Sequence, residues 1–306
     1  MVMAKTPAQR VGRNRPLIAV FACAAMTWLA AEPVAACKYT VRDVAFVELS
    51  DRPYQGFLYV DSADSAEVQA AQDLAEHRHP DSNVRWQVVL PGTTPTEDLV
   101  KLSEEVDTSS LPVAAVLSPD ARVLELPLTA AADGLATAFE QAMLEVVQSP
   151  LREQLLDELP HVHSVAILVE GEDASENQRA AEIVRASIKK IKAVLADLPK
   201  PIKNPPRLIV MSPAAARQEA VLLWSLGIDV ANSPQVTRVA AVFGRGRLLG
   251  RVMEGDEISE RNITRTLAVA GLDCERALDR TWMRTPMFPP RWTARREDHV
   301  AQALEF

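Results

Sequence analysis

A chain of 306 residues has room for about two domains, and 48% hydrophobic with 24% charged residues is the balance of a globular protein. The formal net charge of −8 argues against nucleic acid as the main partner, because proteins that bind a duplex usually carry a basic excess. The acidic excess instead suits a protein that stays dispersed in solution.

The first 36 residues are predicted to be an export signal. Basic residues between positions 5 and 15 precede an apolar run at 17–31, which is shorter than the ~20 residues that a membrane-spanning helix needs. Small residues at 34–36 come directly before Cys37 and predict a cleavage site there. We therefore expect an exported protein, located in the periplasm or anchored to the membrane at the cell envelope.

Cys37 has two alternative roles. The sequence Val34-Ala35-Ala36-Cys37 resembles the bacterial lipobox, in which the cysteine carries lipid and attaches the chain to the membrane. Without lipid, Cys37 could form a disulfide with Cys274, the only other cysteine that remains once the signal is removed. Lipoproteins usually follow this cysteine with a polar tether, whereas strand-like residues follow it here, and both alternatives stay open.

Strands and helices are predicted to alternate through the first half of the mature chain. An opening extended segment is expected at 38–49, where apolar residues alternate. The elements that follow are a strand at 56–61, a helix from 64 to 78, a strand at 84–90, a helix at 96–105, a β-hairpin at 111–126 and a helix at 131–147. The hairpin is predicted because two apolar strands flank a tight turn at Pro119-Asp120.

The same order is predicted again after a short connecting helix at 153–159. It comprises a strand at 162–170, a helix opened by a capping box at 175–178, a strand at 207–211, a helix at 214–226, a hairpin at 239–252 and a helix at 259–272. The sequence Val-Ala-Ala-Val occurs in both hairpins, so one architecture is expected twice. The expected domains are 37–150 and 151–272, followed by a tail at 273–306.

Strand–helix–strand–helix–strand–strand–helix, found twice, resembles the thioredoxin-like fold. Leu111-Pro112 stands directly before the first hairpin strand, where thioredoxin-like proteins place a cis-proline facing their active site. Arg238 takes the equivalent place in the second repeat. The resemblance implies an α/β protein with two tandem thioredoxin-like domains. Each would have a mixed central sheet with a C-terminal hairpin and flanking helices, and Pro112 would be the cis-proline candidate.

Neither repeat contains the motif that makes such domains redox-active. Thioredoxin-like oxidoreductases carry Cys-x-x-Cys at the N-terminus of the first helix, where the helix dipole lowers the thiol pKa. The corresponding turns, 61–67 and 170–176, are acidic and contain no cysteine. We expect no catalytic residues and no cofactor, and the resemblance implies a binding or spacer module. A divergent thiol–disulfide oxidoreductase is an alternative.

Four of the five histidines form two His-x-His pairs, His77/His79 and His161/His163. On a strand such a pair points to one face, so two pairs could supply four imidazoles to Zn²⁺ or Cu²⁺. This pattern makes a metal-handling protein a further alternative. Against it, the first pair lies where a helix ends before Pro80, a position that suits cationic side chains.

The tail combines aromatic and arginine side chains, among them Trp282, Arg284, Phe288, Arg291 and Trp292. Protein interfaces use such residues as anchors, and a basic, aromatic segment could also rest on anionic lipid. The alternative is that the tail folds back over an open side of a domain core, as an extended segment that suits its prolines. The sequence therefore predicts a non-enzymatic binding or scaffold protein whose partner is another envelope protein.

Overall fold

The computed structural model describes residues 39–47, 52–63, 65–128, 134–198, 200–230, 236–274 and 281–305. They form a mixed α/β fold with two mixed β-sheets, as the α/β prediction requires. The predicted export signal and Cys37 lie outside the described residues. Within the ranges given above, no helix has both the length and the apolar character needed to cross a membrane.

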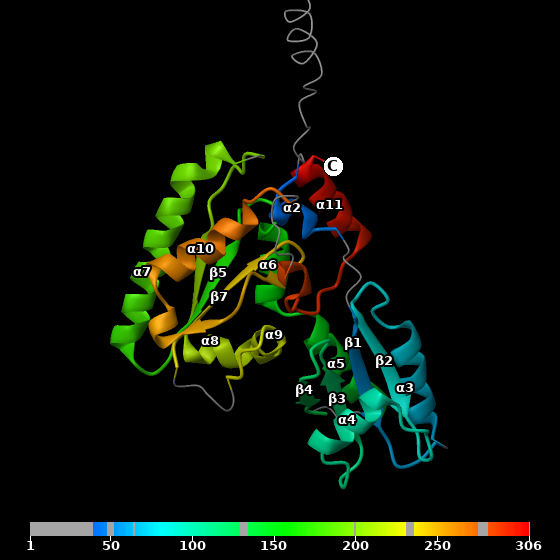
Figure 1. Ribbon diagram of the computed structural model, residues 1–306. Coiled ribbons are helices and arrows are strands. Elements are labelled where there is room, and N and C mark those ends of the chain that lie inside the picture. Colours follow the sequence, from blue (N-terminus) through cyan, green and yellow to red (C-terminus); the bar gives the residue numbers. More distant parts are fainter. Residues whose placement is uncertain are drawn as a thin grey trace, which may run out of the picture. The chain divides into compact units, whose positions relative to one another are not determined.

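The first sheet has the strand order β2-β1-β3-β4, in which β1 pairs parallel to β2 and the other pairs are antiparallel (Figure 1). Its elements are β1 (Tyr54–Tyr59), α3 (Ala66–His77), β2 (Val84–Val89), α4 (Glu97–Glu105), β3 (Val113–Leu117), β4 (Val123–Leu126) and α5 (Leu135–Val147). Alternation along β1 places Leu58 in one core with Phe139 of α5, and Phe57 in another with Leu102 of α4. Helices therefore cover both faces of this sheet.

The second sheet repeats that order as β6-β5-β7-β8, with β9 as a further partner of β7. Its elements are α6 (Pro150–Glu158), β5 (Val165–Val169), α7 (Ala174–Val194), β6 (Arg207–Met211), α8 (Pro213–Gln218), α9 (Ala220–Ser225), β7 (Arg238–Phe243), β8 (Arg247–Leu248), β9 (Met253–Glu254) and α10 (Glu260–Ala270). Leu168 packs in the core that contains residues of α7 and α10, whereas Ile167 packs in the core that contains residues of α6 and α9.

The hairpin between β7 and β8 turns at Gly244-Arg245-Gly246. Gly246 has a φ of +92°, a backbone conformation that favours glycine, and a Cβ atom there would overlap the ring of Phe288. The turn predicted from the Gly-Arg-Gly sequence is therefore also a place where the tail approaches the backbone closely.

The opening segment is not the strand that the sequence predicted. It forms the short helix α2 (Val41–Val44), because Thr40 and Asp43 make a capping box in which each side chain binds the backbone N–H of the other. This segment, which was expected in the first domain, packs on the second sheet. Val41 and Phe46 are buried in the two cores of the second sheet, and the backbone N–H of Val41 donates to Leu272 O at 2.9 Å.

Two helices differ from the bounds that the sequence predicted. The capping box expected at 175–178 is replaced by Asp173, which accepts from the N–H groups of Ser175 and Glu176 and so starts α7 two residues earlier. The helix expected at 214–226 is divided into α8 and α9 at Glu219, whose buried carboxylate accepts hydrogen bonds from Ser149 and from the N–H of Leu151.

The tail folds back along the chain. A 3₁₀ turn at Thr281–Arg284 leads into extended backbone and then into α11 (Ala294–Leu304), which the proline content did not predict. The extended part pairs with β8, since Leu248 N–H donates to Pro286 O at 2.7 Å. It also pairs with the loop before β2, because Trp292 N–H donates to Asp81 O at 2.7 Å.

Candidate functional site

The structure does not assemble the two His-x-His pairs into one metal site. His77 is exposed and bonds to the carbonyl of Asp73, whereas His79 is buried with a φ of +55°. His163 is buried, and His161 is exposed and faces His299 of α11 instead. Across the described ranges, no three or more His, Cys, Asp or Glu side chains form a group that could hold a metal ion.

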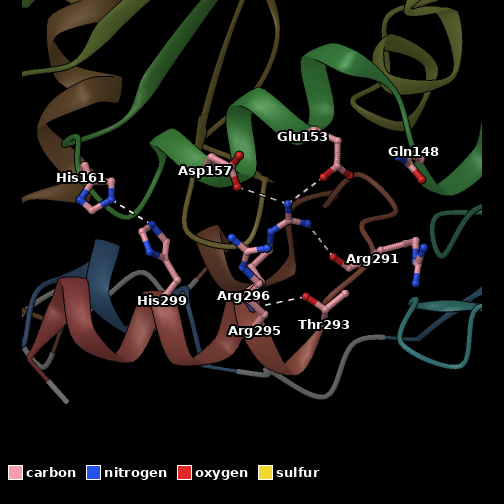
Figure 2. Close-up of a pocket in the computed structure, with 9 residues that line it drawn as sticks. All are labelled: Gln148, Glu153, Asp157, His161, Arg291, Thr293, Arg295, Arg296 and His299. Carbon is pink, nitrogen blue, oxygen red and sulfur yellow. Dashed lines mark hydrogen bonds and ion pairs between the residues drawn. The ribbon is translucent and has the colours of Figure 1, made fainter.

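The contact between His161 and His299 lies at one side of a cavity of about 680 Å³ between α6 and α11 (Figure 2). Arg296 lines the cavity, and its guanidinium donates to Glu153 at 2.9 Å, to Asp157 at 3.3 Å and to the carbonyl of Arg291 at 2.8 Å. The lining residues are Gln148, Glu153, Asp157, His161, Arg291, Thr293, Arg295, Arg296 and His299. The cavity is therefore strongly polar and carries both signs of charge.

His163 gives the chain a pH-dependent stability. Burial, with a smaller effect from Arg42, lowers the pKa of this imidazole to about 4. The folded state therefore favours the neutral ring, and the stability this provides is present above pH 6.5 and is lost as the pH falls from 6.5 towards 4. Between pH 7 and 4.5 we expect the free energy of unfolding to fall by about 2–3 kcal/mol more in the wild type than in His163→Gln. Urea unfolding at both pH values measures this difference, and equal losses in the two proteins would contradict it.

The aromatic residues of the tail are mostly inside the protein. Trp282 and Phe288 are 4% and 0% exposed and belong to the cores of the second sheet. Trp292 is half-buried under the guanidinium of Arg245, 4.2 Å from its ring centroid, and Arg291 pairs with Asp81 at 2.9 Å. These positions favour the alternative that the tail folds back, with Trp282 and Phe288 inside the core.

Cys274 lies where the segment at Tyr39 and Thr40 meets the end of α10. Its backbone N–H donates to Tyr39 O at 3.3 Å, and Thr40 forms an isolated β-bridge with Asp273. Cys37 lies outside the described residues, so the choice between lipid and disulfide remains a prediction. The pairing of these two segments places Tyr39, two residues after Cys37 in sequence, next to Cys274.

The Leu111–Pro112 peptide bond, which the sequence left open between cis and trans, is cis. Elsewhere in the part of the chain that the structure describes, no peptide bond is cis. In the second repeat, the strand β7 begins with Arg238, which is buried and lies 3.3 Å from Glu254. Thr237 precedes it.

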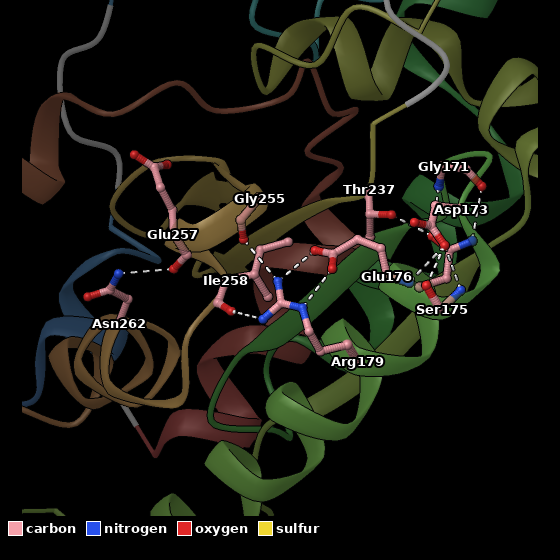
Figure 3. Close-up of polar contacts among 11 residues, drawn as sticks. Gly171, Asp173, Ser175, Glu176, Arg179, Thr237, Gly255, Glu257, Ile258 and Asn262 are labelled. Atoms are coloured by element: carbon pink, nitrogen blue, oxygen red, sulfur yellow. Dashed lines mark hydrogen bonds and ion pairs between the residues drawn. The ribbon is translucent and has the colours of Figure 1, made fainter.

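Thr237 closes a hydrogen-bond network at the N-terminus of α7 (Figure 3). Its hydroxyl donates to Oδ1 of Asn177 at 2.6 Å. The same oxygen accepts from the N–H of Gly171 at 2.9 Å, and the Asn177 amide donates to Gly171 O at 3.0 Å. Asp173 Oδ1 accepts hydrogen bonds from the N–H groups of Ser175 and Glu176 in the first turn. The sequence did not single out Thr237 or Asn177, because neither belongs to a recognisable motif.

Arg179 joins this first turn to the loop after β9. Its guanidinium contacts both carboxylate oxygens of Glu176 at 2.6 Å and donates to the carbonyls of Ile258 at 2.9 Å and Gly255 at 3.0 Å (Figure 3). The hydrogen bond from Arg179 holds the pKa of Glu176 below its usual value. A cavity of about 440 Å³ lies beside the network, and its lining includes Thr237 and the ion pair between Glu176 and Arg179.

No protein-family model matches the sequence, and no curated protein matches it either. The fold and the site define a mixed α/β protein whose two sheets share one strand order. Any function must therefore be argued from the residues of this chain.

Proposed function

We propose that this chain is a non-catalytic, exported binding or scaffold protein of the cell envelope, built on two tandem, redox-inactive thioredoxin-like domains. The single observation that carries the proposal is the network at the N-terminus of α7. Asp173, Asn177 and Thr237 occupy with internal hydrogen bonds the place where a thioredoxin-like oxidoreductase presents its nucleophilic thiol.

Three further features support the thioredoxin-like assignment. Both sheets combine one parallel pair with an antiparallel hairpin in the same spatial order, and helices pack on both faces of each. The cis bond at Pro112 directly precedes β3. Of the described residues only Cys274 is a cysteine, and it follows the C-terminal end of α10 rather than opening a helix.

The redox part of the proposal is tested by reduction of insulin with dithiothreitol in the presence of the mature chain. We expect the rate to equal that of dithiothreitol alone, and Cys274→Ser to give the same rate, because among the described residues no thiol stands at a helix N-terminus. A known thioredoxin is the positive control. Acceleration by the wild type that is lost in Cys274→Ser would overturn the proposal in favour of a divergent oxidoreductase.

The export part is tested by the intact mass of the protein recovered from the cell envelope, with and without reductant and thiol alkylation. A chain that begins at Cys37 supports export. Added diacylglycerol and fatty acid would place it on the membrane beside a membrane-bound partner, whereas two thiols that alkylate only after reduction would show a disulfide between Cys37 and Cys274. A full-length chain in the cytoplasm would contradict export.

A further inference from the structure

We propose that His161 and His299 form a binding site for a divalent transition-metal ion, with Cu²⁺ preferred over Ni²⁺ and Zn²⁺. The two Nε2 atoms lie 3.0 Å apart, and the ring planes meet at 74° (Figure 2). Two imidazoles bound to one ion at a metal–nitrogen distance of about 2.05 Å have nitrogens about 2.9–3.4 Å apart, for bond angles between 90° and 110°. The observed separation falls within this range.

A metal ion and a proton compete for the same position between the two rings. In the contact as it stands, one imidazole can donate an Nε2–H only if the other presents a bare Nε2. Metal ligation requires both nitrogens to be bare. Burial, followed by His299, Arg42 and Lys203, lowers the pKa of His161 from its ordinary value.

Each ring is carried by backbone that is fixed by other contacts. The N–H of His161 donates to Glu158 O at 2.8 Å, and its carbonyl accepts from the Asn204 amide at 2.8 Å. His299 lies on α11, whose residues Val300 and Leu304 are buried in the second sheet's core. The pair is therefore preorganised by two elements that are far apart in sequence, which reduces the conformational cost of binding an ion.

The cavity beside the pair is lined by carboxylates as well as by arginines. Arg296 of α11 is paired with both Glu153 and Asp157. Asp157 lies four residues before His161 in sequence and lines the same cavity, whose volume leaves room for water to complete the coordination shell. Imidazole ligands suit Cu²⁺, Ni²⁺ and Zn²⁺, with Cu²⁺ bound most tightly, whereas Ca²⁺ and Mg²⁺ require oxygen ligands.

The test is titration of the mature protein, stripped with a chelator, dialysed and thiol-alkylated, with Cu²⁺ and separately with Zn²⁺ at pH 7.5. Calorimetry should give one ion per chain, and the electron paramagnetic resonance of bound Cu²⁺ should show two nitrogen ligands. We expect His161→Gln and His299→Gln each to weaken Cu²⁺ binding at least tenfold. His77→Gln, which removes an exposed histidine on α3, should leave binding unchanged.

A second measurement distinguishes this site from scattered surface binding. Because the ion would join the loop after α6 to α11, Zn²⁺ should raise the thermal unfolding temperature of the wild type and not that of His299→Gln. Mg²⁺ should raise neither. Cu²⁺ affinities that agree within twofold between the wild type and His299→Gln, or a spectrum with one nitrogen ligand, would overturn the proposal. Insulin reduction does not depend on this site, so the two proposals can fail separately.

Discussion

Replacing Arg152 with methionine is expected to lower the free energy of unfolding by about 3–5 kcal/mol. Arg152 is 2% exposed, and its guanidinium binds the carbonyls at the end of α5. It donates to Glu145 O at 2.5 Å and Gln148 O at 2.8 Å, and also to Val146 O, while Nε donates to Ser149 Oγ at 3.0 Å. One buried cation therefore caps α5 and joins it to α6.

The expected loss is large because methionine fills much of the space but provides no donor. Three helix-end carbonyls would lose their partner, and the buried Glu219 carboxylate would lose the nearby cation. Burial lowers the pKa of Arg152 only to about 10, so the wild-type side chain remains charged at neutral pH. Urea unfolding followed by circular dichroism measures the change.

The matched control for Arg152 is the exposed Arg185 of α7. Arg185→Met should change the free energy of unfolding by no more than about 0.5 kcal/mol. A loss below 1 kcal/mol in Arg152→Met would show that water can replace the guanidinium at the end of α5.

Phe288→Ala is expected to lower the free energy of unfolding by about 3–5 kcal/mol. The ring is fully buried in the second sheet's core, against Gly246, and its backbone N–H donates to Gly246 O at 3.1 Å. Because Gly246 has no side chain and lies in a fixed turn, the site cannot easily collapse around the cavity that alanine would leave. Thermal or urea unfolding of the purified variant measures the loss.

Arg284→Ala is the control within the same tail, because Arg284 is exposed. Its stability should stay within about 0.5 kcal/mol of the wild type. If Phe288 were instead an interface anchor, its alanine variant would be as stable as Arg284→Ala. That result would return the tail to its interpretation as an interaction segment.

The order of elements could be predicted where periodicity and turns were strong. The β3–β4 hairpin lies where the alternating residues around Pro119-Asp120 placed it, and β5 is a continuous apolar run. The prediction of a strand around Thr40 was wrong, because alternation of apolar residues over a few positions also fits one turn of helix. Its capping box and its tertiary contacts with Leu272 decided the outcome.

Less of the candidate site than of the fold could be predicted from the sequence. The absence of a Cys-x-x-Cys motif from the turns at 61–67 and 170–176 could be read directly from the sequence. The contact between His161 and His299 could not be predicted from the sequence. The two residues are 138 positions apart, and His299 has no second histidine beside it in α11. The burial of Trp282 and Phe288 was likewise undetermined, since aromatic side chains suit interfaces and cores equally well.

The two sheets differ in when they can be completed. All buried residues of the first sheet's cores lie between Tyr54 and Val147, whereas those of the second extend from Val41 to Leu304. A chain grows from its N-terminus, so the first sheet has its full set of core residues while the second is still being synthesised. Val41 and Phe46 are made before either sheet, yet they find their partners only at the end. Chain order thus makes the half that is completed last depend on residues that are synthesised before either sheet.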